Sequence, residues 1–218
     1  MSKLLEAFEK NPLTLIVDLP KNSKEFAKAA IEGGADALVA RISGAIKDER
    51  KDLEEILGIS DIPVGVTFGF KVKEADVRSI KAMGIDFFIV PLEEIPAWML
   101  KVKGIAKVAS INPSYSVDRL IGLSKLRIEA LEASIIPRVH HGKLLTVGDL
   151  QQYITVCISA NVPVIISTEC AIKVSEAAII WDTGAKGLQI NEVVTGKTIK
   201  SLKKAVNEFR IAIDDIGG

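Results

Sequence analysis

Residues 164–190 read VIISTECAIKVSEAAIIWDTGAKGLQI and contain one complete strand–helix–strand unit. The unit begins with a β-branched run at 164–168 and ends with a second short apolar run at 187–190. Between them, apolar residues recur at helical spacing over 174–181, and Gly184 follows where a helix end favours a residue of positive φ. Because parallel strands need a crossover helix, this stretch predicts a βαβ unit.

The same unit repeats along the whole chain. The phrases GGADALVA at 33–40, MGIDFFIV at 83–90 and TGAKGLQI at 183–190 each place a glycine just before a short strand. Strands are predicted at 14–18, 37–41, 64–68, 87–90, 107–111, 135–140, 164–168 and 187–190. Helices are expected at 23–32, 73–83, 116–131, 147–160 and 174–181, with a last helix at 198–213 that packs beside the first. This alternation predicts an α/β fold, a single-domain (β/α)8 TIM barrel over residues 1–218.

A doubly wound open sheet is the competing architecture. Such sheets usually have about five or six strands and a glycine-rich first turn. The first turn here reads DLPKNS at 18–23 and has no glycine. The missing glycine and the larger number of predicted strands favour the closed barrel.

The composition fits a barrel and limits its partners. Apolar residues make up 48% of the 218 residues and aromatic residues 5%, as expected for an aliphatic core of strands buried on both faces. Lys plus Arg and Asp plus Glu balance at 28 each, so neither nucleic acid nor a membrane is predicted as a partner. No apolar run reaches the ~20 residues that span a bilayer, and residues 1–12 have no signal-peptide core. With Cys157 and Cys170 too few for a disulfide scaffold, these features predict a cytoplasmic protein.

Polar residues are predicted to gather at one end of the barrel. Alternate strand residues point inward, and catalytic groups lie at the C-terminal strand ends. If the apolar residues of each strand face the helices, the polar residues between them face the barrel interior. These inward polar residues are Asp18, Arg41, Thr67, Ser110, Asn112, Arg138, His140, Ser167, Glu169, Gln189 and Asn191. Ionisable groups at strand ends are costly unless they pair or bind a ligand. We therefore expect Asp18, Arg41, Arg138, His140 and Glu169 to converge on a common cavity.

These charged residues suit acid/base chemistry on an anionic substrate. Histidine titrates near neutrality, so His140 is the predicted acid, with Asp18 or Glu169 as the base. Arg41 and Arg138 are predicted to bind anionic groups, because guanidinium matches the geometry of phosphate and carboxylate.

Asn112 and Asn191 are the remaining predicted substrate contacts. The alternative for any polar strand end is that it is solvated or bonded to loop backbone. This alternative applies most to Thr67, Ser110 and Gln189.

The sequence contains no motif typical of a metal site, a nucleophilic serine or a Schiff-base lysine. No H-x-H, H-E-x-x-H or C-x-x-C spacing occurs, and the adjacent His140 and His141 point opposite ways on an extended segment, so no metal site is predicted. No G-x-S-x-G elbow is present, and the predicted register points Lys107 toward the helices rather than into the barrel. No cofactor is predicted.

The C-terminal quarter resembles a known superfamily. Residues 162–210 resemble the seventh and eighth βα units of the phosphate-binding (β/α)8 barrels, to which thiamine-phosphate synthase and isomerases and synthases of the tryptophan and histidine pathways belong. The matching features are the strand at 164–168, a helix ending at Gly184, the strand at 187–190 and a glycine before the last helix. GIDFFIVP at 84–91 also resembles the fourth strand of small sugar-acid aldolases of that group. The resemblance implies an isomerase, lyase or synthase acting on a phosphorylated metabolite.

The expected phosphate site departs from the pattern of that superfamily. Its members carry a Gly-Gly pair after strand seven and a Gly-Ser or Gly-Thr turn after strand eight, whose backbone N–H groups hold the phosphate. Here those positions read STECAI and INEVVTG, and Glu169 brings a negative charge. The start of the last helix is predicted to bind phosphate instead, through Thr195, Gly196, Lys197 and Thr198. The alternative is an ordinary capped helix start, since a nucleotide P-loop needs glycine where Asn191 stands.

Two functions therefore remain open from the sequence. One is an enzyme that acts on a small phosphorylated metabolite by acid/base chemistry at the C-terminal face of the barrel. The other is a non-catalytic barrel that binds a small anionic ligand or a protein partner, because fold alone does not determine chemistry. A homodimer is also predicted as an assembly, through the apolar segment of Pro96, Trp98, Met99 and Leu100. The alternative is that this segment packs on its own barrel.

Overall fold

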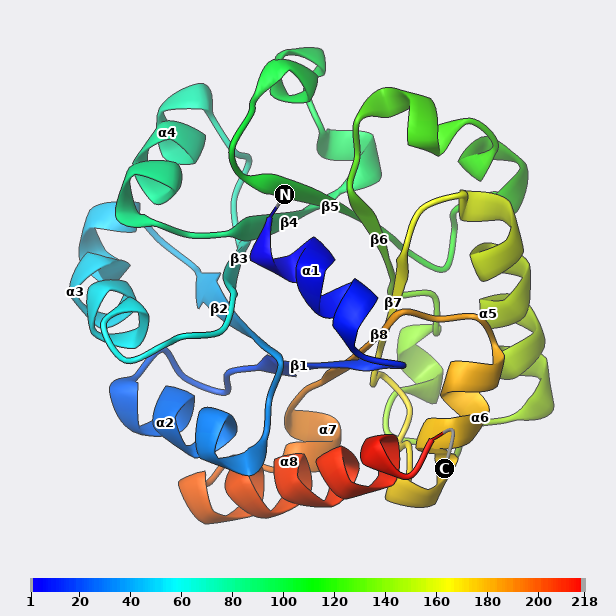
Figure 1. The fold of residues 1–218 in the computed structure, drawn as a ribbon. Coiled ribbons are helices and arrows are strands. Elements are labelled where there is room, and N and C mark those ends of the chain that lie inside the picture. The colour runs from blue at the N-terminus through cyan, green and yellow to red at the C-terminus, as the bar shows by residue number, and fades with distance from the viewer. Residues whose placement is uncertain (1, 217–218) are drawn as a thin grey trace.

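The computed structural model describes residues 2–216 and shows eight parallel strands that close into a barrel (Figure 1). Each strand pairs with the next along the chain, and β8 pairs with β1. The strands are β1 Thr14–Asp18, β2 Ala37–Ile42, β3 Val64–Phe68, β4 Phe87–Pro91, β5 Ala106–Ile111, β6 Ala130–Ala133, β7 Val164–Ser167 and β8 Gly187–Ile190. The predicted (β/α)8 TIM barrel fold is confirmed.

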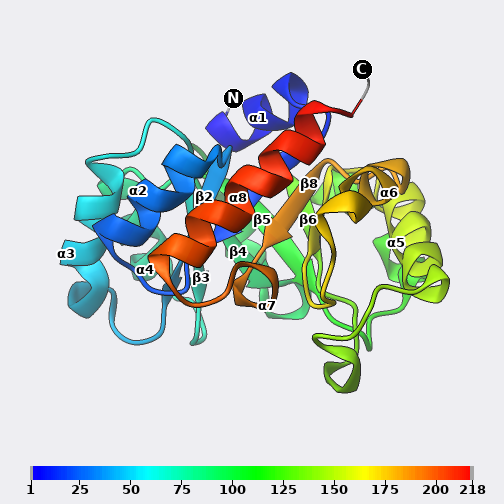
Figure 2. The ribbon, with the colours of Figure 1, turned by 90° about the horizontal axis from the view of Figure 1, so that it is seen from below.

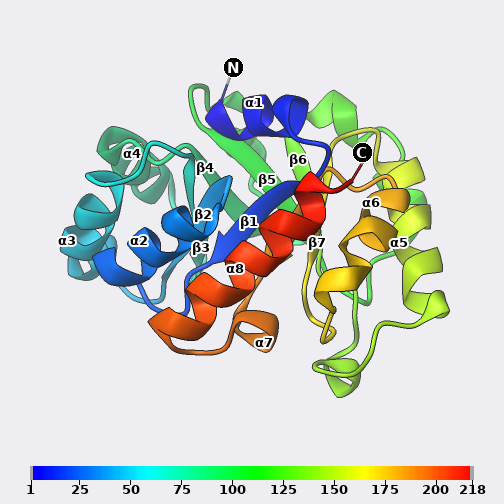
Figure 3. The same cartoon turned by 60° about the horizontal axis from the view of Figure 1, so that its bottom comes forward.

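Helices surround this barrel, with α1 and α7 at its two ends (Figure 2). They are α1 Lys3–Lys10, α2 Lys24–Gly33, α3 Ile46–Leu57, α4 Glu74–Met83, α5 Val147–Ala160, α6 Ala177–Asp182, α7 Glu192–Thr195 and α8 Ile199–Asp214. As predicted, the last long helix, α8, lies beside α2 (Figure 3). Gly33 permits this contact, because an added Cβ there would lie 2.8 Å from the Cβ of Val206. Within residues 2–216, no helix is long and apolar enough to cross a membrane.

Two apolar layers hold the barrel together. Outward strand residues pack against the helices in the larger layer. The smaller layer fills the barrel interior with Leu4, Phe8, Ile16, Ala37, Val39, Phe87, Ile89, Ala106, Val108, Ala130 and Ile165. The ring of Phe87 is fully buried and lies against Gly65, where an added Cβ would come within 2.2 Å of a ring carbon. Glycine at position 65 is therefore required by the aromatic side chain that fills the interior.

Helix α1 closes the N-terminal end of the barrel (Figure 1). Its side chains Leu4 and Phe8 are buried in the interior layer. Asp86, just before β4, accepts the backbone N–H groups of Lys3 at 3.0 Å and Leu4 at 2.9 Å. A carboxylate here satisfies free N–H groups and interacts favourably with the helix dipole. Because this end is sealed, a ligand has access from the opposite end, where the C-terminal ends of the strands and α7 lie (Figure 2).

The prediction for the sixth strand and the preceding helix is wrong. Strand β6 spans Ala130–Ala133 rather than 135–140. The segment predicted as a helix at 116–131 contains two short 3-10 helices and the start of β6. Gly122 at φ 87° and Arg127 at φ 53° interrupt any regular α-helix there. The helix-forming residues EALEA at 129–133 become a strand because β5 and β7 pair with both of its edges, so tertiary pairing overrides local propensity.

The segment predicted as a subunit contact packs on its own barrel. Met99 is fully buried, and Trp98 and Leu100 are half-buried against the same core, in the 3-10 helix Ala97–Lys101. This packing matches the alternative given for the segment, and the homodimer stays a prediction.

Candidate functional site

A cavity opens at the C-terminal ends of the strands, and we call it the mouth cavity. Its volume is about 350 Å³. Its lining consists of Asp18, Arg41, Thr67, Phe68, Gly69, Glu132, Ser134, His141, Ser167, Glu169, Gln189, Asn191 and Val193. A second hollow of about 540 Å³ adjoins it and shares Asp18, Arg41, Asn191 and Val193 with it. The polar residues of several strands therefore meet at one end of the barrel, as the alternation predicts.

Asp18 and Arg41 lie at the ends of the neighbouring strands β1 and β2. The side chain of Asn22 fixes the backbone of Arg41, because its Nδ2 donates to the Arg41 carbonyl at 2.6 Å and its Oδ1 accepts the Arg41 N–H at 3.1 Å. Burial raises the pKa of Asp18 from 3.8 to about 7, and the positive charge of Arg41 opposes the rise. The nearby carboxylates Glu132 and Glu192 add to the rise in this pKa. Asp18 therefore exchanges its proton near neutral pH, as a general acid or base requires.

Glu169 follows β7 and is held in place by two donors. The Ser134 hydroxyl donates to its Oε1 at 2.5 Å, and the Ile136 N–H donates to its Oε2 at 2.9 Å. His141 Nε2 lies 3.6 Å from the same Oε1 and 2.9 Å from the carbonyl oxygen of Ile136. Burial raises the pKa of Glu169, while the two hydrogen bonds and His141 oppose the rise. The result is a carboxyl group of fixed orientation whose proton is held more tightly than in water.

Glu132 is a site residue that the sequence analysis misses. It lies in β6 with 8% of its surface exposed, and its Oε1 accepts the Ser167 hydroxyl at 2.8 Å. Alternation places Ala130 and Glu132 inward and Leu131 outward, but only if the strand is assigned to 130–133. Because inward and outward positions depend on the register, misplacing β6 removed Glu132 from the predicted set.

Arg138 and His140 lie outside the mouth cavity. Both are exposed in the 3-10 helix Arg138–His140, beyond the end of β6. The predicted convergence is therefore right for the other three charged residues and wrong for these two. The physical reason is that strand alternation does not apply to a loop, and the turn here brings His141 toward Glu169 instead.

Of the two predicted amide contacts, only Asn191 lines the mouth cavity. Its Oδ1 accepts the N–H of Val193 at 2.9 Å, so it also caps α7. Asn112 is exposed after β5, and its Oδ1 accepts the N–H of Ser114 at 2.8 Å. It borders a different hollow, on the side of α5.

The four residues predicted to bind phosphate, 195–198, do not line the mouth cavity. Thr195 is buried, and its hydroxyl bonds to the carbonyl oxygens of Asn191 at 3.0 Å and Gly196 at 3.1 Å. Thr198 caps α8, since its Oγ1 accepts the N–H of Ser201 at 3.1 Å. Lys197 Nζ lies 3.6 Å from Glu192 Oε2. This geometry is that of the ordinary capped helix start, and phosphate binding by Thr195, Gly196, Lys197 and Thr198 stays a prediction.

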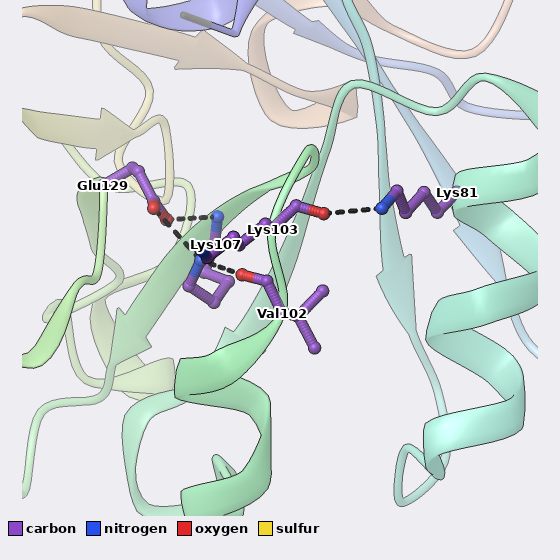
Figure 4. A network of polar contacts seen from close by, with 5 residues as sticks. All are labelled: Lys81, Val102, Lys103, Lys107 and Glu129. Carbon is purple, nitrogen blue, oxygen red and sulfur yellow. Dashed lines mark hydrogen bonds and ion pairs between the residues drawn. The ribbon is translucent and has the colours of Figure 1, made fainter.

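Lys107 lies on the helix side of the barrel wall, as its predicted outward register requires (Figure 4). Its Nζ lies 3.0 Å from Glu129 Oε1 and 3.3 Å from the carbonyl oxygen of Val102. The amine of β5 is therefore paired in the wall rather than directed into the mouth cavity. Nearby, Lys81 Nζ donates to the carbonyl oxygen of Lys103 at 2.7 Å. In the part of the chain that the structure describes, no three His, Cys, Asp or Glu side chains are grouped closely enough to hold a metal ion.

Solved structures with the same fold match nearly the whole chain. Thiamine phosphate pyrophosphorylase from Pyrococcus furiosus has a TM-score of 0.70 at 21% identity, covering 95% of this chain and 98% of that one. Tryptophan synthase from Mycobacterium tuberculosis has a TM-score of 0.75 at 15% identity, covering 97% and 98%. A mutant tryptophan synthase alpha-subunit from Pyrococcus furiosus has a TM-score of 0.68 at 14% identity, covering 92% and 98%.

No family model matches the chain, and no curated protein matches it. The structural similarity therefore shows the (β/α)8 barrel fold and nothing beyond the fold. The chemistry must be argued from the residues of the mouth cavity.

Proposed function

We propose that this chain is an enzyme that performs acid/base chemistry on a small anionic metabolite in the mouth cavity. The observation that carries the proposal is Asp18, a half-buried carboxyl group that lines the mouth cavity beside Arg41 and whose pKa is raised to about 7. Such a group holds and releases a proton at neutral pH, which an isomerase, lyase or synthase of this fold needs. A charged group with a strongly shifted pKa in a cavity marks a functional site.

Each charged residue of the mouth cavity has a role in this proposal. Asp18 transfers the proton to or from the substrate, and Glu169, fixed by Ser134 and Ile136, is the second proton-transfer group. Arg41 binds the anionic group of the substrate, because its guanidinium can form two parallel hydrogen bonds to a phosphate or carboxylate. The acid role assigned to His140 from the sequence passes to His141, which lies against Glu169.

A phosphate ester is the first anion to test. One structural neighbour is named thiamine phosphate pyrophosphorylase, so a barrel of this shape is associated with a phosphate compound. Lys21 and Arg41 are the two cationic residues that line the second hollow, and the carboxyl groups of Asp18, Glu49, Asp52 and Glu192 line it as well. The phosphate group is thus proposed to lie at the β1 and β2 side of the mouth cavity.

The test is a binding screen of small organic phosphates and carboxylates, followed by a search for turnover of the compounds that bind. Arg41→Ala is expected to weaken binding about tenfold or more, because a charge-assisted hydrogen bond is lost. Asp18→Asn is expected to keep binding but to lower turnover about 10²–10⁴-fold. Arg138→Ala is the matched control, since it removes the same charge from an exposed position outside the cavity.

Two results would contradict the proposal. If Arg41→Ala and Arg138→Ala affect every bound compound equally, the mouth cavity is not the binding site. If a compound binds at Arg41 but no proton-transfer reaction occurs, the chain is a non-catalytic barrel that binds a small anionic ligand.

A further inference from the structure

The mouth cavity holds more acidic than basic side chains. Its carboxyl groups come from Asp18, Glu132 and Glu169, and its basic groups are Arg41 and His141. The positive charge of Arg41 lowers the pKa of Asp18, and His141 Nε2 lies 3.6 Å from Glu169 Oε1. No Lys, Arg or His of residues 2–216 lies within ion-pair distance of Glu132. The carboxyl group in β6 therefore has no counter-charge from the described chain.

Acceptors on the neighbouring strands lack donors as well. Gln189 lines the cavity from β8 with only 4% of its surface exposed, and its Oε1 has no hydrogen-bond partner within the described residues. The same holds for Oγ1 of Thr67 on β3, again counting only residues 2–216. A buried polar atom without a partner carries a desolvation cost that a ligand can remove. Within the described residues, the amide oxygen of Gln189 therefore lacks a donor, whereas Glu132 accepts the Ser167 hydroxyl and lacks only a counter-charge.

The lining of the cavity indicates the kind of donor. Within residues 2–216, these groups do not form the close set of three or more ligands that a metal ion requires. An ammonium group has three N–H donors and a full positive charge, and it can reach separate acceptors at hydrogen-bond distance. It therefore suits a pocket with an unpaired carboxylate charge at Glu132 and an amide oxygen at Gln189 that lacks a donor within the described residues.

We propose that the deep side of the mouth cavity, formed by Glu132, Glu169 and Gln189, binds a protonated amine of the substrate. The inference rests on the proposed function and adds its substrate class, a small zwitterionic metabolite. The anionic group of this metabolite binds Arg41, and its amine binds Glu132 and Gln189. The amine supplies the missing counter-charge and the missing donor in one group.

The experiment compares pairs of phosphate compounds that differ only in the group at the end of the chain opposite the phosphate. ω-Aminoalkyl phosphates, beginning with phosphoethanolamine, are each paired with the alkyl phosphate in which a methyl group replaces the ammonium group. Dissociation constants are measured by calorimetry or by NMR on the full chain. We expect the amine of the best-fitting length to bind about tenfold tighter than its alkyl partner, from one charge-assisted hydrogen bond.

Two variants assign this preference to residues. Glu132→Gln and Gln189→Met should each reduce the affinity ratio of amine to alkyl compound toward one, while leaving the affinity of the alkyl phosphate unchanged. Glu208→Gln is the matched control for the loss of one carboxylate, since Glu208 is exposed on α8, far along the chain from the lining residues. Circular dichroism and thermal unfolding check that each variant is folded. If one of the two cavity variants does not fold, the other still tests the proposal.

The outcomes separate this inference from the proposed function. The amine site is overturned if the unmodified chain binds the amine and alkyl compounds with nearly equal affinity. It is also overturned if neither Glu132→Gln nor Gln189→Met changes the affinity ratio of amine to alkyl compound. Absence of binding by every amine compound overturns it as well. In each of these cases the proposed function stands if Arg41→Ala still weakens the binding of an alkyl phosphate or carboxylate, and it fails if Arg41→Ala has no effect on any compound that binds.

Discussion

The two ends of the barrel are built from opposite kinds of residues. At the N-terminal end, α1 buries Leu4 and Phe8, and both oxygens of Asp86 accept backbone N–H groups. At the C-terminal end, burial raises the pKa of Asp18, and the amide oxygen of Gln189 has no partner within residues 2–216. Folding is favoured by the first arrangement and opposed by the second. The difference shows that stability is concentrated at one end of this molecule and chemistry at the other.

The largest expected effect is at the apolar end. Phe87→Ala removes the aromatic ring that fills the barrel interior against Gly65. We expect the free energy of unfolding to fall by about 3–5 kcal/mol, because the cavity left behind cannot collapse inside a closed barrel. Chemical denaturation measures this loss. Ile158→Ala, at a position 73% exposed on α5, is the control and should change stability by no more than about 0.5 kcal/mol.

The next effect is at the polar end and depends on pH. The pKa of Asp18 rises from 3.8 to about 7 on folding, so the folded state binds more protons than the unfolded state between these values. The stability contributed by Asp18 therefore falls as the pH rises from about 4 to about 7. Asp18→Asn removes this dependence, and the variant should become more stable than the unmodified chain by about 2–3 kcal/mol above pH 7.

This second prediction is checked by denaturation at several pH values and by a carboxyl NMR titration of Asp18. Below about pH 4 the difference between Asp18→Asn and the unmodified chain should vanish, since Asp18 is then protonated in both states. A midpoint near 4 in the titration would contradict the raised pKa and remove the contrast between the two ends.

A smaller effect is expected where α1 meets the barrel. Asp86→Ala removes the acceptor of two backbone N–H groups at the start of α1. The expected loss is about 1–2 kcal/mol, the usual range for an N-terminal cap. Hydrogen exchange of the α1 amides should increase as well. Glu9 is exposed in the same helix, so Glu9→Ala should change neither the stability nor the hydrogen exchange of the α1 amides.

The smallest effect is expected at Glu132, which is compared with Glu129 three residues before it. Glu132 has no cationic partner in the described part of the chain, whereas Glu129 pairs with the buried amine of Lys107 at 3.0 Å. Glu132→Gln should leave stability within about 1 kcal/mol or raise it, because repulsion from Asp18 and Glu169 is removed. Glu129→Gln should lower stability by about 1–3 kcal/mol, because it leaves a buried charge without its counter-charge. Equal losses would show that Glu132 is structural rather than functional.

The sequence by itself determined the rhythm of strands and helices and most of the inward register. Alternation within a strand and periodicity within a helix are local properties, so they can be read from neighbouring residues. They placed Asp18, Arg41 and Glu169 at one mouth and Lys107 on the helix side, as the structure does.

Only the tertiary structure decided the position of β6 and the residues that depend on it. EALEA at 129–133 favours a helix locally and becomes a strand because it completes the ring between β5 and β7. That pairing brings Glu132 into the mouth cavity, and the loop after it brings His141 there in place of His140. The pKa of Asp18 likewise depends on burial and on charges from distant parts of the chain. These properties arise from contacts between residues far apart in the sequence, and no local pattern encodes such contacts.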